Sequence, residues 1–465
     1  MPQTPPDYLP LIARLVKPPE RFTAAMKMVQ PGEQAGRYRH WDIIRHMSPP
    51  GDLSREEWWA LIKMHRSAGM KIIPLRDTRG GGFGYNIPDS VAAQLHEIDL
   101  GAGGTIGVPE PLLNSHSRNQ YLFRSLVQEA ITSSQLEGAV TTREVAKEMI
   151  RTGRAPRDKS EQMILNNYLT MQEIRTWKDR SLTPDLVLEI HRCVTAETLD
   201  KPEAAGRFRQ HDELVYVLNE LTGEVFHTPP PAGDLPQRIE QMCRFANGEE
   251  PAHFLHPVLR AILLHFWLAY DHPFVDGNER TARALFYWCM LRQQYWLFEY
   301  ISISEILLRA PAKYALAFLH TETDRNDLTY FIIHQAAVIR QAIQGLHAYI
   351  DRKAQELAST EAVLKSGADL NHRQEALIIH ALRNAGTRYT IEAHRKSQSI
   401  AYETARGDLV GLAEIGWLEM HRAGKAFVFY APVDLPSRIR AHCARGGERR
   451  GGAAPSPLIQ NALQK

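Results

Sequence analysis

The sequence contains few cysteines and no motif that would use them. Four cysteines are spread along 465 residues without a CxxC pair: Cys193, Cys243, Cys289 and Cys443. This spacing argues against a structural zinc site and against a disulfide framework. The sequence therefore predicts reduced thiols.

Long apolar runs and an excess of charge of one sign are also missing. No stretch approaches the ~20 apolar residues of a membrane-spanning helix, and the first residues lack a basic segment followed by an apolar core. We therefore expect a cytoplasmic protein with no membrane partner. The formal net charge is +2, so any contact with nucleic acid must be local.

The residues that carry chemistry are concentrated in one polar stretch, 272–283. It lies between residues 252–270 and 281–293, which have apolar side chains at helical spacing, so it forms the junction of two helices. The second helix therefore begins at this loop. The chemically active residues of the stretch are His272, Asp276, Gly277, Asn278, Arg280 and Arg283.

These residue types suit the binding and transfer of phosphate groups. A helix N-terminus offers unpaired N–H groups and partial positive charge, and Gly277 allows close approach of a ligand. Arg280 and Arg283 are three positions apart and share a helical face, so both can grip outer phosphates. Asp276 can hold Mg2+ together with those phosphates. His272 can take the proton from an attacking hydroxyl group.

The whole stretch resembles the signature of the Fic family, His-x-Phe-x-Asp/Glu-Gly-Asn-x-Arg-x-x-Arg. The resemblance implies a mainly α fold, with a helical core and a β-hairpin flap. It implies transfer of AMP from ATP, with Mg2+, to a Ser, Thr or Tyr hydroxyl of a target protein, which could be the protein itself. The matching positions imply a base at His272, a Mg2+ ligand at Asp276, an α- and β-phosphate cradle at Gly277 and Asn278, phosphate clamps at Arg280 and Arg283, and a loop anchor at Phe274.

Glu279 departs from this signature. The family usually has Gly, less often Lys, at that position in the phosphate-binding loop. A glutamate there could bring an anion toward the phosphates and weaken the use of ATP, or change the donor. Alternatively, it faces solvent and stabilises the helix through its first-turn position.

A second motif, Ser133-Ser134-Gln135-Leu136-Glu137-Gly138, closes an amphipathic run at 121–136. It resembles the inhibitory motif of the family. The resemblance implies that Ser133, Glu137 and Gly138 form a restraint in which Glu137 pairs with Arg283 and blocks the γ-phosphate. A solvated glutamate before a glycine that ends a helix is the simpler interpretation.

Two β-prone runs between these motifs predict a hairpin. The first is Leu214-Val215-Tyr216-Val217, and the second lies in the segment that begins at Thr222 and runs through Val225, Phe226 and His227, with a polar turn between the two runs. The resemblance implies a flap that pairs with a target segment through main-chain hydrogen bonds. A surface hairpin without a partner is the alternative.

The C-terminal third indicates a different fold. Helical patterns at 372–384, 390–396 and 401–415 precede two strands, 418–421 and 426–430, which is typical of a winged helix-turn-helix. Such a domain binds DNA or docks a protein. The candidate DNA-binding residues are Lys396, Tyr402, Thr404 and Arg406.

The predicted domains are an N-terminal extension of unknown role (1–105), a Fic catalytic domain with inhibitory helix and flap (106–360), a winged helix-turn-helix (365–435) and a disordered basic tail (436–465). We expect an autoinhibited protein adenylyltransferase. Removal of AMP from a target, use of another phosphate-containing donor, and a catalytically weak nucleotide-sensing DNA-binding regulator stay open. A homodimer also stays open.

Overall fold

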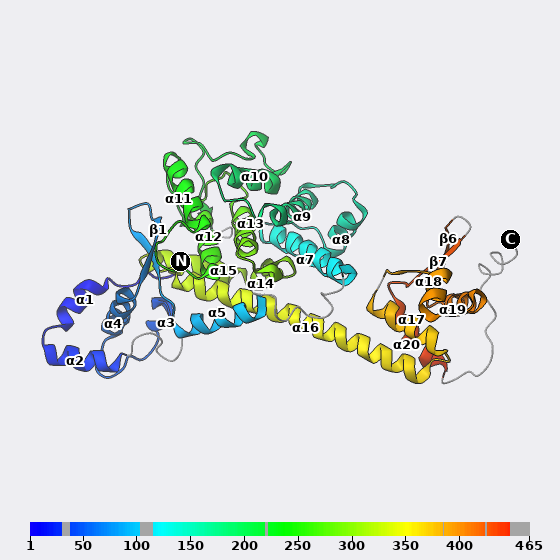
Figure 1. Ribbon diagram of the computed structural model, residues 1–465. Coiled ribbons are helices and arrows are strands. Elements are labelled where there is room, and N and C mark those ends of the chain that lie inside the picture. The colour runs from blue at the N-terminus through cyan, green and yellow to red at the C-terminus, as the bar shows by residue number, and fades with distance from the viewer. Residues whose placement is uncertain (30–37, 103–114, 219–221, 385, 424–425, 447–465) are drawn as a thin grey trace. The chain divides into compact units, whose positions relative to one another are not determined.

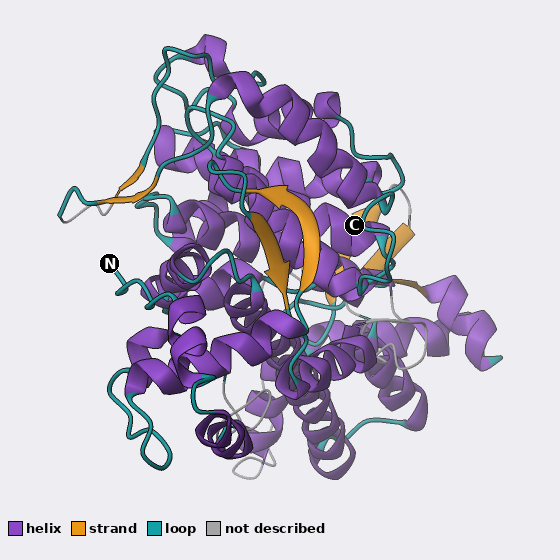
Figure 2. Ribbon diagram, turned by 90° about the vertical axis from the view of Figure 1, so that its left-hand side faces the viewer, coloured by secondary structure: helices purple, strands orange, loops and turns teal. Residues whose placement is uncertain are grey.

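The computed structural model describes all residues except 30–37, 103–114, 219–221, 385, 424–425 and 447–465 (Figure 1). The fold is mainly α, as predicted, and Figure 2 shows few strands among many helices. The chain forms two compact units. The first comprises Met1–Thr105 and Arg124–Gln344, and the second comprises Ile106–Phe123 and Gly345–Lys465.

The N-terminal part of the first unit packs around its own tryptophans. Its core includes Trp41, Trp58 and Trp59, all buried. These tryptophans are therefore packing residues. Its elements are α1 (Tyr8–Leu15), α2 (Pro19–Met28), α3 (Trp41–Ile44), α4 (Arg55–Ala68), the antiparallel pair β1 (Lys71–Arg76) and β2 (Gly82–Tyr85), and α5 (Asp89–Ala102).

The two helices that flank the polar stretch form the centre of the first unit. In α12 (Pro257–Asp271) every residue after the first is buried, as expected of a helix that is apolar on all sides. It packs against α13 (Asn278–Arg292). The surrounding helices are α7 (Ser115–Leu136), α8 (Arg143–Thr152), α9 (Lys159–Trp177), α10 (Pro184–Thr195), α11 (Leu235–Asn247), α14 (Ile303–Arg309), α15 (Pro311–Thr323) and α16 (Thr329–Gly367), with 3-10 turns at Pro202–Ala204, Ala232–Asp234 and Trp296–Glu299.

The hairpin is present, but its first strand is later than predicted. β3 (Val217–Leu218) pairs antiparallel with β4 (Val225–His227). Of the four predicted strand residues, only Val217 is in β3; Leu214, Val215 and Tyr216 lie before it. Leu214 and Tyr216 are exposed, so β-propensity there is not supported by packing. Residues 219–221 of the turn lie outside the described residues.

The second unit contains the helices and strands predicted for the C-terminal third. These are α17 (His372–Arg383), α18 (Ile391–Gln398), α19 (Tyr402–Glu414) and a sheet in the order β5-β7-β6, formed by β5 (Arg388–Thr390), β6 (Glu419–Ala423) and β7 (Ala426–Tyr430). Asp408 on α19 joins α17 through Arg373, with 2.8 Å between Oδ2 and Nε. Asp408 is therefore a packing residue of this unit.

The predicted disordered tail begins too early. Residues 435–446 form α20 (Leu435–Gly446), because Leu435 and Ile439 are buried in the core of the second unit. The prediction of disorder rested on the arginines and glycines of this segment, but the burial of the two apolar residues holds its first part in a helix. Residues 447–465 lie outside the described residues. No helix in the described part of the chain is both long enough and apolar enough to cross a membrane.

Candidate active site

The polar stretch forms a tight loop with a left-handed residue at each end. His272 ends α12 with φ of 45°, and its N–H donates to the carbonyl of Leu268 at 2.9 Å. Gly277 precedes α13 with φ of 81°. A Cβ atom at Gly277 would lie 2.5 Å from Cγ2 of Thr195. Only glycine therefore fits at this position.

Asn278 holds the loop closed on itself. Its amide accepts from the N–H of Phe274 and donates to the carbonyl of Phe274, both at 2.9 Å. The capping position of α13 is Gly277, and the Asn278 side chain is buried within the loop. Its amide therefore shapes the loop, so only its backbone could contribute to a phosphate cradle.

His191 on α10 supports the same loop and was not singled out in the sequence. Its Nε2 donates to the carbonyl of Asp276 at 2.9 Å, and its Nδ1 accepts from the N–H of Gly206 at 3.0 Å. The ring stacks on Phe274, with 3.7 Å between centroids. Burial lowers the pKa of His191 to about 4, so the ring is neutral. Phe274 is fully buried, as its predicted anchoring role requires.

The backbone sets the tautomer of His272. Nδ1 lies 3.3 Å from the carbonyl of Ala269, which can only accept, so Nδ1 carries the proton and Nε2 is the basic atom. Burial, and then the positive charge of His227, lower the pKa of His272 to about 4. The neutral form needed for proton acceptance is therefore present at physiological pH.

His227, at the end of β4, carries the charge that acts on His272. Its Nδ1 meets Oε2 of Glu322 and its Nε2 meets the carbonyl of Tyr270, both at 2.7 Å. Both partners accept, so both ring nitrogens donate. Burial opposes the charge, but the hydrogen bond and charge of Glu322 raise the pKa of His227. Arg209 also holds the backbone of the loop, because its Nε donates to the carbonyl of His272 at 2.9 Å.

Asp276 and Arg280 lie together at the start of α13. The Asp276 carboxylate accepts from the N–H of Gly277 at 2.5 Å and lies 3.5 Å from Nη2 of Arg280. The Asp276 side chain is 52% exposed. An accessible carboxylate beside a phosphate seat fits Mg2+, which needs few protein ligands. Arg280 is buried, and burial lowers the pKa of its guanidinium.

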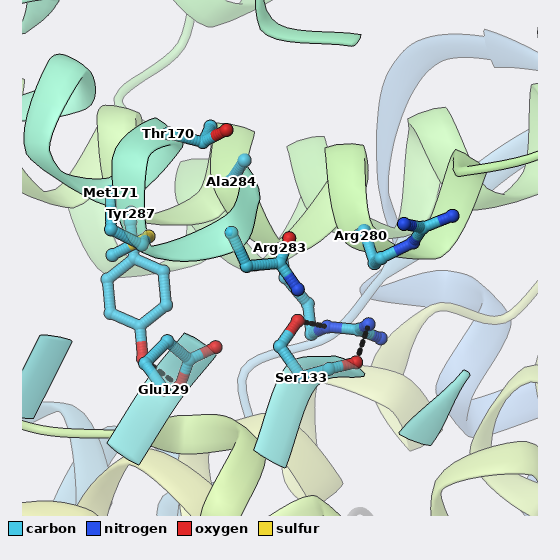
Figure 3. Close-up of a pocket in the computed structure, with 9 residues that line it drawn as sticks. Glu129, Ser133, Thr170, Met171, Arg280, Arg283, Ala284 and Tyr287 are labelled. Carbon is cyan, nitrogen blue, oxygen red and sulfur yellow. Dashed lines mark hydrogen bonds between the residues drawn. The ribbon is translucent and has the colours of Figure 1, made fainter. Parts of the chain in front are cut away.

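Arg283 points away from the loop and toward α7. Its Nε donates to Oγ of Ser133 at 2.9 Å, and its Nη2 donates to the Ser133 carbonyl at 3.0 Å (Figure 3). Nη2 also donates to Oε1 of Glu137 at 2.8 Å, which is the pairing that the second motif implied. Nη1 is buried and has no partner among the described residues. Despite burial, the charge of Glu137 raises the pKa of Arg283. Gly138 follows Glu137 with φ of 87°.

Glu279 lies beside the same arginine. The Tyr314 hydroxyl donates to its Oε2 at 2.9 Å, and Tyr314 is buried. Burial, and then the charge of Glu137, raise the pKa of Glu279 to about 7, whereas Arg283 acts in the opposite direction. The interpretation that Glu279 faces solvent is therefore wrong, because its carboxylate is engaged inside the site.

A buried glutamate anchors α7 against α13 and α14. The Glu129 carboxylate accepts from the Tyr287 hydroxyl at 2.8 Å, from Ser302 Oγ at 2.7 Å, and from both Oγ and N–H of Ser304 at 2.5 and 3.1 Å. Figure 3 shows Tyr287 reaching down to Glu129 beside Ser133. A small cavity here is lined in part by Glu129, Ser133, Arg280 and Arg283.

A second histidine and carboxylate cluster does not fit a metal ion. His40, Asp42 and His320 lie together, with Asp42 Oδ2 3.6 Å from His320 Nε2 and 3.8 Å from His40 Nδ1. The two rings stack at 4.1 Å with 12° between their planes. Histidine binds metals through lone pairs in the ring plane, and two stacked planes cannot share one ion. The cluster is a packing contact between α3 and α15.

The candidate DNA-binding residues lie in the second unit. Lys396 is on α18, and Tyr402, Thr404 and Arg406 are on α19. All but Arg406 are exposed, but Lys396 and Arg406 have carboxylates within 3.7 and 3.5 Å on their own helices. These partners offset much of the positive charge that a phosphate backbone would need.

The sequence matches both a family model and individual known proteins. The sequence model of the Fic/DOC family matches residues 181–290. A protein named protein adenylyltransferase Fic from Nematostella vectensis is 33% identical over 167 residues, which are 34% of this chain and 36% of that protein. Its namesake from Drosophila melanogaster is 38% identical over 109 residues, covering 23% of this chain and 20% of that protein. The chain thus spans about a third or less of the length of these relatives.

The fold is similar to that of a solved structure. A Fic family protein from Desulfovibrio desulfuricans aligns with a TM-score of 0.50 at 20% identity, over 75% of this chain and 98% of that chain. This likeness concerns the fold alone. The residues that match the family model include the whole loop described above, from His272 to Arg283.

Proposed function

We propose that residues 181–290, which match the model of the Fic/DOC family, form a domain of that family and that the protein acts through it as a protein adenylyltransferase. The substrates of this proposal are ATP and a hydroxyl group on a target protein. The observation that carries it is the state of His272, whose Nδ1 is held by a carbonyl and whose Nε2 is left basic at the loop. The names of the related proteins support the same activity.

In the proposed reaction, Nε2 of His272 takes the proton of the target hydroxyl. The hydroxyl oxygen then bonds to the α-phosphorus, and pyrophosphate leaves with the electrons of the broken bond. Arg280 and the N-terminus of α13 stabilise the negative charge of the phosphates. Mg2+, when held by Asp276 and the donor, would neutralise charge on the leaving group.

We propose further that the protein is restrained by Glu137. Arg283 makes hydrogen bonds to Glu137 and Ser133, so in this state it is not available to an outer phosphate. The pair is charged and partly buried, so separating it costs free energy and keeps the active form scarce.

The test uses ATP labelled at the α-phosphate. We expect covalent label on protein, its loss in His272→Ala, and an increase of about tenfold or more in Glu137→Gly, which corresponds to one broken charged contact. Glu144→Gly, at an exposed position of α8, is the matched control. Label that persists in His272→Ala, or equal labelling of the two glycine variants, would contradict the proposal.

A second proposal concerns the other unit. Its order of helix, strand, two helices and hairpin supports a winged helix-turn-helix, with DNA or a protein as partner. The four exposed or partly exposed residues on α18 and α19 remain the candidate contacts. Loss of salt-dependent binding to duplex DNA in Tyr402→Ala would favour DNA, and no binding by the full chain would favour protein docking. The domain boundaries, the cytoplasmic location and a homodimer stay predictions.

A further inference from the structure

Glu279, in the first turn of α13, is a carboxylate that the proposed mechanism does not use. Two hydrogen bonds in series hold its carboxylate: the buried His265 bonds to the Tyr314 hydroxyl, and this hydroxyl bonds to Glu279. The Tyr314 hydroxyl donates to Glu279, so it accepts from Nε2 of His265 at 2.7 Å. In agreement, Nδ1 of His265 is buried without a partner in the described part of the chain, and burial lowers the pKa of His265 to about 3. These two hydrogen bonds fix Glu279 in place.

Arg283 therefore faces two carboxylates rather than one. Glu137 contacts it directly, and Glu279 acts on it by charge from its own helix. When Glu137 withdraws, the Glu279 carboxylate remains, because it belongs to α13 and is tied to Tyr314 on α15. An outer phosphate that reached Arg283 would then lie near a fixed negative charge.

We propose that Glu279 determines the donor specificity of the site, disfavouring nucleoside triphosphates relative to nucleoside diphosphates. The inference rests on the proposed function, since it assumes that the outermost phosphate is directed to Arg283. A diphosphate ends before that seat and avoids the repulsion. Repulsion between like charges at a partly buried site lowers affinity, and we expect a difference of about tenfold, which corresponds to about 1.4 kcal/mol.

Transfer from a diphosphate balances in the same way as transfer from a triphosphate. The target oxygen bonds to the α-phosphorus, and the bond from this phosphorus to the bridging oxygen breaks. Orthophosphate leaves with the electron pair, and the hydroxyl proton goes to Nε2 of His272. No further reactant is needed.

The test measures the binding of ADP and of ATP, each with Mg2+, by calorimetry at about pH 8. All variants carry Glu137→Gly, so that the first carboxylate is absent. Relative to this background, we expect Glu279→Gln to tighten ATP binding about tenfold and to change ADP binding less than about twofold. Glu279→Asp keeps the charge and should keep the preference for ADP.

The control is Glu305→Gln, which removes a partly exposed carboxylate paired with Arg309 on α14. It should leave both affinities unchanged. The inference is overturned if both nucleotides bind but Glu279→Gln leaves their ratio unchanged or tightens both equally. If neither nucleotide binds to any variant, the proposed function fails as well. Because Gln has nearly the same shape as Glu, loss of the fold does not obscure the result.

Discussion

His272 owes its basic nitrogen to contacts that fix its proton on the other side of the ring. The carbonyl of Ala269 holds the proton on Nδ1, and the imidazolium of His227 disfavours a second proton. The pKa of His272 is lowered to about 4, so the neutral form prevails at all higher pH values. At the scale of single residues, the pH dependence of AMP transfer therefore measures the pKa of His272.

The first residue-scale prediction concerns His227. In the Glu137→Gly, Glu279→Gln background, where Glu279 no longer titrates, the acid limb of kcat against pH should lie near 4. Replacing His227 with Gln removes the neighbouring positive charge, so the pKa of His272 should rise and the acid limb should move toward 6.5, the ordinary value for histidine. An acid limb that stays in place would mean that burial alone sets the pKa of His272.

The second residue-scale prediction concerns stability. The pKa of Glu279 is raised by burial and by Glu137 to about 7, from an ordinary 4.5, so its ionised form is disfavoured in the folded protein. The protonated carboxyl therefore favours the folded state over the unfolded state. This contribution to the stability of the fold is complete below about pH 4.5 and is lost as the pH rises through about 7. Glu279→Gln should therefore raise the melting temperature by roughly 2–4 °C near pH 8.5, and less as the pH falls.

Several neighbouring groups also affect the ionisation of Glu279, and therefore the change of melting temperature with pH. Glu137, Arg283, Tyr314 and His227 act on it by charge or hydrogen bond. Calorimetry of Glu137→Gly alone separates the contribution of the Glu137 charge, which raises the pKa of Glu279. A stabilisation by Glu279→Gln that is equal at pH 5 and pH 8.5 would show that the carboxylate is not titrating in this range.

At the scale of elements, the carboxylate of Glu129 holds α7 in place, eight residues before Glu137, the proposed inhibitory residue. Glu129 lies on α7, and Glu137 directly follows its last residue, Leu136, so the anchor and the restraint belong to the C-terminal half of the same helix and the turn that ends it. Glu129 accepts four hydrogen bonds from α13 and from the start of α14. Loss of this anchor should loosen the restraint as well as the packing.

The element-scale prediction is therefore a coupled effect of Glu129→Ala. Leaving several buried donors unpaired should cost about 1–3 kcal/mol or more, seen as a lower melting temperature. Labelling from ATP should rise in the otherwise native chain but not in Glu137→Gly, where the restraint is already absent. An equal rise in both backgrounds would separate Glu129 from the restraint.

At the scale of the whole molecule, the N-terminal segment is part of the first unit. Lys63 on α4 is buried and lies 2.8 Å from Asp324 and 3.3 Å from Asp327, which are in the connection between α15 and α16. The Tyr38 hydroxyl also donates to Asp327 at 2.6 Å. The segment was interpreted from sequence as a separate module, but it supplies the cation that these buried carboxylates need.

The prediction at this scale is that Lys63→Ala destabilises the first unit. Removing one member of a buried ion pair leaves charge uncompensated and typically costs about 3–5 kcal/mol. Lys27→Ala, at an exposed position of α2, is the control and should have little effect. Thermal unfolding of the two variants checks this, and equal melting temperatures would contradict it.

Much of the active loop could be predicted because its determinants are local. Apolar periodicity placed the two helices to within a few residues, and the glycine at 277 marked the turn between them. Local patterns were less informative where packing decides. β3 begins at Val217 rather than Leu214, and Leu435 and Ile439 extend a helix into a region whose composition indicated disorder.

The amino-acid sequence by itself determined which groups gather in the loop, because twelve consecutive residues cannot be far apart and a helix start has a fixed polarity. Only the tertiary structure decided which groups surround them. His191, His227, Tyr314 and Glu129 come from other helices and strands, 35 to 158 positions from the residues they contact. Their roles depend on distance and burial, which no periodicity along the chain encodes. The direction of Glu279, toward Arg283 rather than solvent, was decided in the same way.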